Sequence, residues 1–283
     1  MAGGSTLQRR PEMATPPDLR SVYAVSAAQC DAFRRDGFIH LPGLCSPDEV
    51  AAWRTEIRRA SAAGNRELRP LAERDTYGKA FLQTLNLRLI APVIERFVTA
   101  PRFGGVAAAL LGVEAVRLFH EQSLFKEPGG GATPWHQDQQ YWPLDSEFCL
   151  GMWMPLVDCD EDMGVLRFAA GSHRLGRVDD LTISDASEAT YARLISERGL
   201  TVRSEPMRAG DATFHWGWSM HGAGPNRTER LREAMIVTFF ADGTRVATPR
   251  HQAQDYDRVN FLGGRRPGER ADGPLNPLLA PPI

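Results

Sequence analysis

The sequence lacks several features that would identify a common class of protein. Its 283 residues carry 33 basic and 35 acidic side chains, a formal net charge of -2. With no basic excess, binding to nucleic acid or to an acidic membrane surface is not expected. No apolar run is long enough to span a bilayer, so membrane insertion is not expected either. Nothing in the composition indicates an oligomeric state.

Cysteine is also scarce. The 4 cysteines are Cys30, Cys45, Cys149 and Cys159, and no two of them form a CxxC pair. A chain of this length can bury a core without disulfides, so reduced thiols are the better interpretation. The first residues lack the apolar core of a signal peptide. Both observations favour a cytoplasmic protein.

The remaining composition is ordinary for a globular protein, with 42% hydrophobic and 24% charged residues. We predict a disordered N-terminal segment over residues 1–20, because this stretch is polar and contains Gly, Pro and Arg. A single domain is predicted over residues 21–262. Residues 263–283 form a tail rich in Gly and Pro, which predicts coil.

The first part of the domain carries helix signals. Ser26 is placed to cap a helix that stops at Gly37, and Ser46 to cap a longer amphipathic helix. Residues 88–111 are predicted to hold two more helices, broken near a proline. These segments would pack outside whatever core the second part forms.

After residue 112 the chain changes to short β-branched and aromatic runs separated by Gly, Pro and Asp. This pattern is typical of a mainly β fold with flanking helices, a double-stranded β-helix of the jelly-roll or cupin-like barrel type. Residues 179–198 interrupt the pattern and are predicted to form a loop and helix over one barrel mouth. Strands are predicted over residues 116–125, 150–156, 165–168, 201–206, 212–216 and 234–240, and a short one over residues 38–41 before them.

His136 and Asp138 are the first candidates for chemistry. They are two residues apart, so in an extended strand both side chains leave the same face. With one more histidine they would form a 2-His-1-carboxylate set, which binds one face of a non-haem iron and leaves the opposite face open. The alternative is a surface loop with incidental polar residues, since a short motif by itself is weak evidence.

His221 is the preferred third ligand. It precedes a Gly- and Pro-containing turn, which would place it at a barrel rim, whereas His215 lies in an aromatic run and is better suited to the core or to supporting a ligand. Arg232 begins the next apolar strand. A guanidinium on a neighbouring strand can hold a carboxylate with two parallel hydrogen bonds.

Together these residues belong to an ordered series that resembles the phytanoyl-CoA dioxygenase family of Fe(II)/2-oxoglutarate oxygenases. The resemblance covers roughly residues 26–245, and the interval of 232 − 221 = 11 residues between the last histidine and the arginine agrees with that family. The matching positions are His136-Gln-Asp138, Tyr141-Trp-Pro143, Trp153, Gly164-Val-Leu166, Gly171-Ser-His173, Gly210-Asp211, His221, Asn226 and Arg232.

The resemblance implies a function. Fe(II) would bind His136, Asp138 and His221, and Arg232 would hold the distal carboxylate of the co-substrate 2-oxoglutarate. With O2, such an enzyme oxidises an unactivated C–H bond of a small organic substrate, most simply by hydroxylation, and releases succinate and CO2. A natural-product or lipid-like intermediate is the predicted substrate. Related halogenases have Ala or Gly in place of the carboxylate, so Asp138 argues against halogenation.

Other residues are weaker candidates. By resemblance, Lys126, Gln122 and Trp153 face inward and contact 2-oxoglutarate, although a strand-end lysine reaching solvent and a core tryptophan are the simpler alternatives. Many family members carry a hydroxyl two residues after the distal histidine. This chain has Ala223 there, and Thr228 is one candidate to replace it. The predicted substrate contacts are Gln83, Asn86, Tyr141, Trp142 and Trp218.

Three alternatives remain open on the sequence. The same iron site would also serve desaturation, epimerisation or ring closure in secondary metabolism. A cupin-like isomerase or hydrolase would use the three ligands with Zn, Mn or Ni and would not need Arg232. A non-catalytic binding barrel would need neither the three ligands nor Arg232, and the intact ligand set argues against this alternative.

Overall fold

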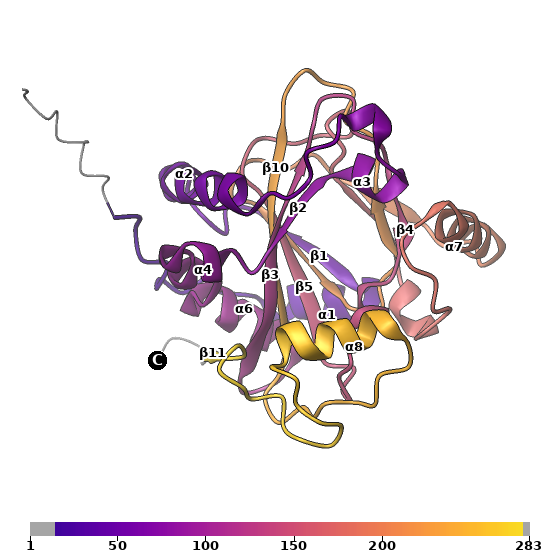
Figure 1. Cartoon of the computed structure of the whole chain (residues 1–283). Helices are drawn as coiled ribbons and strands as arrows, with labels where there is room; N and C mark the ends of the chain where they lie inside the picture. Colours follow the sequence, from indigo (N-terminus) through magenta and orange to yellow (C-terminus); the bar gives the residue numbers. More distant parts are fainter. Residues whose placement is uncertain (1–14, 280–283) are drawn as a thin grey trace, which may run out of the picture.

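The structure is a computed structural model that describes residues 15–279. Two antiparallel β-sheets face each other and form its core (Figure 1). The larger sheet contains β1 (Phe38–Leu41), β2 (Leu82–Leu85), β3 (Val116–Lys126), β5 (Cys149–Pro155), β8 (Ala212–Trp216), β10 (Arg232–Ala241) and β11 (Leu278–Leu279). The smaller sheet contains β4 (Thr133–His136), β6 (Leu166–Ala169), β7 (Val202–Ser204) and β9 (His221–Ala223).

Strand order agrees with the predicted jelly-roll type of fold. The larger sheet runs β1-β8-β5-β10-β3-β11, with β2 beside β3, and the smaller sheet runs β4-β9-β6-β7. Neighbours in the sheets are mostly far apart in sequence, as expected when a chain winds between two sheets. All seven predicted strands form within two residues of their predicted bounds. The four strands that the sequence did not predict (β2, β4, β9 and β11) have two to four residues, too few to carry a clear period of two.

Helices pack outside the sheets (Figure 1). The hydroxyl of Ser26 accepts from the Gln29 backbone N–H, and the chain leaves the first helix through Gly37 at a φ of 83°, as predicted. The predicted pair of helices in 88–111 is wrong in detail, because the segment divides into α4, a 3-10 turn, α5 and α6. The helices are α1 (Ala27–Asp36), α2 (Pro47–Gly64), α3 (Thr76–Ala80), α4 (Leu87–Ile90), α5 (Glu95–Val98), α6 (Pro101–Leu111), α7 (Asp185–Glu197) and α8 (Gln252–Phe261). The 3-10 helices are η1 (Leu71–Glu73), η2 (Pro92–Ile94), η3 (Asp138–Tyr141) and η4 (Ser172–Leu175).

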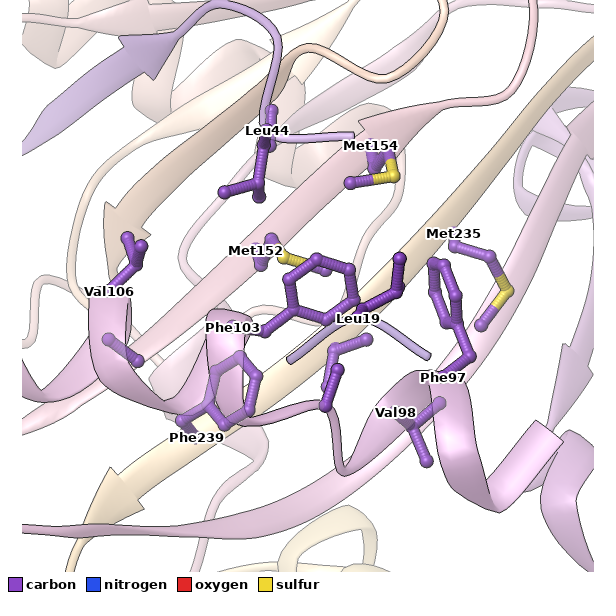
Figure 2. Packing of buried hydrophobic residues seen from close by; sticks show 14 of the residues in the cluster. Leu19, Leu44, Phe97, Val98, Phe103, Val106, Met152, Met154, Met235 and Phe239 are labelled. Carbon is purple, nitrogen blue, oxygen red and sulfur yellow. The ribbon is translucent and has the colours of Figure 1, made fainter. Parts of the chain in front are cut away.

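The main hydrophobic core lies between the helices and the outer face of the larger sheet (Figure 2). Met235 and Phe239 of β10 point into it beside Phe97 and Phe103 of the helical layer. Because successive side chains in a strand alternate, Ile236 and its inward-facing neighbours point to the other side, between the sheets. One face of the larger sheet therefore holds the helices, and the other is free to form a site.

Both ends of the described chain pack against this core. Most of the predicted disordered segment lies outside the described residues, but Leu19 is 1% exposed and packs in the main core. The predicted tail is mainly turns, yet β11 pairs with β3, and the Asn276 amide donates to the carbonyls of Leu118 and Phe261. Both segments thus contribute to the folded domain.

Two expectations from the sequence were reduced cysteines and the lack of a membrane-spanning segment. The four cysteines are all free. Among residues 15–279, no helix combines the length and the apolar character that crossing a bilayer requires.

Candidate active site

A cavity of about 490 Å³ lies between the two sheets. Side chains of β3, β5, β8 and β10 line it on one side, and side chains of β4, β6 and β9 on the other. Residues 182–183 and helix α8 close it toward the surface. The loop of the interrupting segment 179–198 therefore reaches the cavity as predicted, whereas its helix α7 packs on the outside, in the cluster that contains Trp135 and Tyr191.

His136, Asp138 and His221 converge in this cavity, with one ligand atom from each lying within 4.8 Å of the others. The pairing of β4 with β9 places His136 directly opposite His221. Asp138 follows at the start of η3, and its Oδ1 lies 3.4 Å from His136 Nε2 and 3.7 Å from His221 Nε2. The strand register, which no local pattern encodes, thus brings the three predicted ligands together.

Backbone carbonyls orient the two imidazoles. His136 Nδ1 lies 2.8 Å from the carbonyl oxygen of Pro134, and His221 Nδ1 lies 3.0 Å from that of Ser219. A carbonyl only accepts, so each Nδ1 donates and each Nε2 keeps its lone pair for the shared point. Burial, followed by the neighbouring His136, lowers the pKa of His221 well below its ordinary value, which keeps this imidazole neutral.

The carboxylate of Asp138 is held on its other oxygen by His215. His215 Nε2 lies 3.1 Å from Asp138 Oδ2, and this contact needs Gly151, where a Cβ would stand 2.9 Å from the same nitrogen. Burial alone would raise the pKa of Asp138, but its contacts with His221, His136 and His215 lower that pKa well below the ordinary value. The group therefore presents a fixed carboxylate, and His215 supports it, as the sequence suggested.

Arg232 lies buried in the wall of the same cavity. It is 1% exposed, and Nη1 donates to the Gly164 carbonyl at 2.8 Å, while Nε has no partner. Its guanidinium carbon stands 5.6 Å from the centre of the Trp153 ring. Burial lowers the pKa of Arg232 to about 10, which still leaves it charged at neutral pH. Within residues 15–279 no carboxylate pairs with this charge.

Lys126 is the cross-strand neighbour of Arg232 and is also buried. Its ammonium donates to the carbonyl of Gly131 and, at 3.3 Å, to the hydroxyl of Thr133. Burial, and then the nearby Arg232 charge, lower the pKa of Lys126 to about 6. Lys126 does not itself line the cavity, but Thr133 does, so the lysine lies behind this threonine.

Thr133 supplies a hydroxyl at the position where the sequence lacks one. It pairs directly with Ala223 across β4 and β9 and lines the cavity. Thr228, the candidate named from the sequence, donates its hydroxyl to Asn226 Oδ1 at 2.8 Å and does not line the cavity. The sequence could not identify Thr133, because its nearness to Ala223 follows only from strand pairing.

The weaker candidates divide into two groups. Trp153, Gln122, Gln83, Tyr141 and Trp142 line the cavity. Among them, Gln83 donates to Gln122 Oε1 at 2.5 Å and accepts from the Tyr77 hydroxyl at 2.9 Å, so these polar groups are already linked. The indole nitrogen of the fully buried Trp153 has no partner.

Asn86 and Trp218 do not line the cavity. Asn86 precedes α4 in the left-handed region, with a φ of 50°, and its N–H bonds the Glu121 carbonyl. Trp218 presents its carbonyl to the Gln137 amide. Both residues shape the backbone around the site rather than facing it.

The sequence also gave no signal for two buried titratable residues of the wall, His120 and Asp257. His120 of β3 is 6% exposed and its Nδ1 has no partner, while Asp257 of α8 is 8% exposed. His120 had no spacing that favoured a role. Asp257 lies beyond the barrel strands, and only the packing of α8 brings it to the cavity.

Comparison with known proteins identifies the family. The family model for phytanoyl-CoA dioxygenase (PhyH) matches residues 33–234. An ectoine dioxygenase of Bordetella parapertussis is 31% identical over 247 residues, which cover 81% of this chain and 79% of the relative. The chain belongs to the phytanoyl-CoA dioxygenase family.

Solved structures agree with the fold. The epimerase SnoN, in a complex with Fe3+, α-ketoglutarate (2-oxoglutarate) and nogalamycin RO, has a TM-score of 0.75 and 27% identity, with coverage of 89% of this chain and 97% of SnoN. The carbocyclase SnoK from nogalamycin biosynthesis has a TM-score of 0.75 at 23% identity, with coverage of 94% and 100%. The predicted double-stranded β-helix is thereby confirmed.

The predicted enzyme class is confirmed as well: the chain is a 2-oxoglutarate-dependent non-haem iron dioxygenase by family, relatives and ligand geometry. This sets aside the cupin-like isomerase or hydrolase and the non-catalytic barrel. The reaction and the substrate differ among relatives, which include a dioxygenase, an epimerase and a carbocyclase.

Proposed function

We propose that this enzyme oxidises an unactivated C–H bond of a small natural-product or lipid-like molecule, most simply by hydroxylation, with release of succinate and CO2. The observation that carries the proposal is one cavity that holds both a three-ligand set and a buried, unpaired arginine. We also propose that it acts in the cytoplasm, which the four free cysteines support.

His136, Asp138 and His221 fit Fe(II) as ligands. Two imidazoles and one carboxylate are the donor set of non-haem iron oxygenases, and one ligand atom from each of the three residues lies within 4.8 Å of the others. The carbonyls of Pro134 and Ser219 fix the ligating tautomers, so the nitrogens need no rearrangement before binding.

The surroundings of Arg232 fit the distal carboxylate of 2-oxoglutarate. A buried cation without a counter-ion is costly, and an incoming carboxylate removes that cost through charge-assisted hydrogen bonds. The hydroxyl of Thr133 adds a hydrogen-bond donor to the cavity wall, and the side-chain nitrogen of Lys126 behind it donates to that hydroxyl oxygen. Trp153 covers the guanidinium and excludes water from it, which strengthens the interaction.

When bound, Fe(II) and 2-oxoglutarate supply the oxidising power that, with O2, cleaves a C–H bond. The protein's own part is to hold these groups and to orient the substrate over them. Apolar side chains of Leu124, Leu166 and Ile236 line the cavity and keep it dry. The aromatic side chains of Tyr141 and Trp142 provide the wall against which a carbon skeleton would rest.

Epimerisation is a second candidate outcome. It is favoured by the similarity to SnoN, which is 27% identical over 89% of this chain. Desaturation and ring closure need the same residues. What separates these reactions is where the substrate carbon is held relative to the metal.

Anaerobic addition of Fe(II) and then 2-oxoglutarate tests the proposal. A weak visible charge-transfer band is expected only with both additions, and succinate should form once O2 is admitted. If neither the band nor succinate appears, the proposed function is wrong.

Two histidine variants test the ligand assignment. His221→Ala removes a proposed ligand and should reduce Fe(II) or Co(II) affinity by about 100-fold or more, whereas His215→Ala removes a supporting contact and should cost roughly 10-fold. Metal titration of the apo-protein provides the comparison. A larger loss in the His215 variant would overturn the choice of His221.

A further inference from the structure

The cavity has a second unpaired titratable group, far from Arg232. Asp257 is 8% exposed, lines the cavity and, within residues 15–279, forms neither a hydrogen bond nor an ion pair through its carboxyl group. Buried carboxylates are normally paired, so an unpaired one facing a cavity needs a physical explanation.

Helix α8 holds Asp257 in a fixed position. At the start of the helix, His251 Nε2 and the Gln254 amide both donate to the carbonyl of Gln140, at 3.1 Å and 2.8 Å. At its end, the Asn276 amide donates to the carbonyl of Phe261 at 3.0 Å. Both ends of α8 are thus anchored, and the carboxyl group is presented by a rigid element.

These two unpaired groups, Arg232 and Asp257, lie toward opposite ends of the larger sheet. Phe261 at the end of α8 packs on Phe119 at 5.7 Å between ring centres, and Phe119 is 126 − 119 = 7 residues along β3 from Lys126. At about 3.3 Å per residue, this places the two ends roughly 20 Å apart. Asp257 therefore does not serve as a counter-ion for Arg232 or Lys126.

No positive side chain competes for Asp257 at its end of the cavity. Among the described lining residues, Arg232 is the only Lys or Arg, and it lies at the opposite end. His120 lines the cavity, but burial lowers its pKa to about 4, so it is neutral. Burial raises the pKa of Asp257 itself to about 8, so at pH 7.5 the empty cavity holds a largely neutral acid, which ionises when a cation binds beside it.

Aromatic rings surround the same end. The cavity wall on and beside α8 contains the aromatic rings of Tyr141, Trp142, Tyr256 and Phe261. Aromatic faces attract organic cations, and a nearby carboxylate adds a direct counter-charge. The combination of a dry aromatic wall with one carboxyl group is suited to a basic nitrogen on an otherwise apolar molecule.

We propose that Asp257 is a specificity-determining residue that binds a basic nitrogen of the substrate. The inference rests on the proposed function, because it treats this cavity as the substrate site and assigns a chemical class to its occupant. The substrate is then a carbon skeleton that lies against the aromatic wall and carries an amine or similar cation at the end remote from Arg232.

Binding of a charged and a neutral probe tests this proposal. Benzylamine and benzyl alcohol have similar size and both donate hydrogen bonds, but only benzylamine is a cation at pH 7.5. Ligand-observed NMR titration of the full chain should give a Kd for benzylamine roughly tenfold below that for benzyl alcohol. In Asp257→Asn, which keeps the side-chain size, the two Kd values should become equal.

Asp255→Asn is the matched control, because it removes a carboxylate from the same helix. Asp255 is on the surface and pairs with Arg258 at 2.8 Å, so this variant should keep the tenfold preference. The absence of a preference in the wild type, or its persistence in Asp257→Asn, would overturn the inference.

The charge-transfer band of the Fe(II) and 2-oxoglutarate complex, recorded on the same samples, separates the two proposals. A normal band without a cation preference refutes the role of Asp257 alone. A cation preference without a band refutes the oxygenase assignment and leaves the cation site standing.

Discussion

The two faces of the larger sheet differ in whether their buried charged side chains have partners. On the outer face, Glu233 of β10 is 1% exposed and receives two hydrogen bonds from Arg54 of α2, at 2.7 Å and 2.8 Å. Glu121 of β3 is similarly buried and lies 3.4 Å from Arg88. On the inner face, the adjacent Arg232 has no carboxylate partner within the described chain.

This difference distinguishes charged residues that stabilise the fold from charged residues that are available to bind a ligand. A charge buried during folding must be neutralised by the protein itself, and the helices on the outer face supply the partners. A charge that faces the cavity is paired only when a ligand binds. Until then its desolvation lowers the free energy of unfolding, and ligand binding removes this penalty. In this molecule the unpaired buried groups of the inner face are those proposed to bind ligands: Arg232 for an anion and Asp257 for a cation.

The largest expected effect comes from replacing the arginine on each face. Arg232→Met should weaken 2-oxoglutarate binding by about 100-fold or more, because a desolvated charge pair is lost, while the unfolding free energy stays the same or rises. Arg54→Met should leave 2-oxoglutarate binding unchanged and lower the unfolding free energy by about 1–3 kcal/mol, since Glu233 loses its partner. The charge-transfer titration and urea unfolding measure the two quantities. Equal losses of stability in both variants would contradict the comparison.

A smaller effect is expected from the hydroxyl on the inner face. Thr133→Val should raise the Kd of 2-oxoglutarate roughly two- to tenfold, the effect of one neutral hydrogen bond of about 0.5–1.5 kcal/mol. Adding Ala223→Ser to that variant should restore binding, because the two positions face each other across β4 and β9. Thr228→Val is the control and should have no effect. If the Kd of 2-oxoglutarate stays high in the double variant, Thr133 does not supply the missing hydroxyl.

A pH dependence of stability is also expected from the inner face. The pKa of Lys126 is lowered to about 6 from 10.5, so between these values the folded protein binds fewer protons than the unfolded chain. Its contribution therefore makes stability rise with pH across that window. Lys126→Met should be more stable than the wild type near pH 6.5, with a difference that shrinks toward pH 10. Thermal unfolding from pH 6.5 to 9.5 measures this, with Lys79→Met as control. A constant difference would contradict it.

The local signals in the sequence were sufficient for much of the fold. Ser26, Gly37 and Ser46 mark helix ends because a cap forms within a few residues of chain. Seven strands were recognisable by their composition, the longest of them β3, β5 and β10. In residues 88–111 two helices with one break near a proline were predicted. The structure has a further break, because Pro92 and Pro101 each begin a new helical segment.

The site was predictable only where a family pattern extends along the chain. His136, Asp138, His221 and Arg232 fall in an ordered series, and they converge as the series implied. Asn86 and Trp218 were chosen by type and neighbourhood and do not reach the cavity. Residue type alone does not say which way a side chain points when the surrounding segment is irregular.

The sequence by itself determined the helix caps, the longer strands, the ligand set and the class of enzyme, because each depends on short spacings or on an ordered series of residues. Only the tertiary structure decided which charges remain unpaired. Thr133 comes to Ala223 through strand register, His215 to Asp138 through the space left at Gly151, and Asp257 to the cavity through the docking of α8. Pairing across sheets and helices joins residues that are distant in sequence, and no local pattern records such contacts.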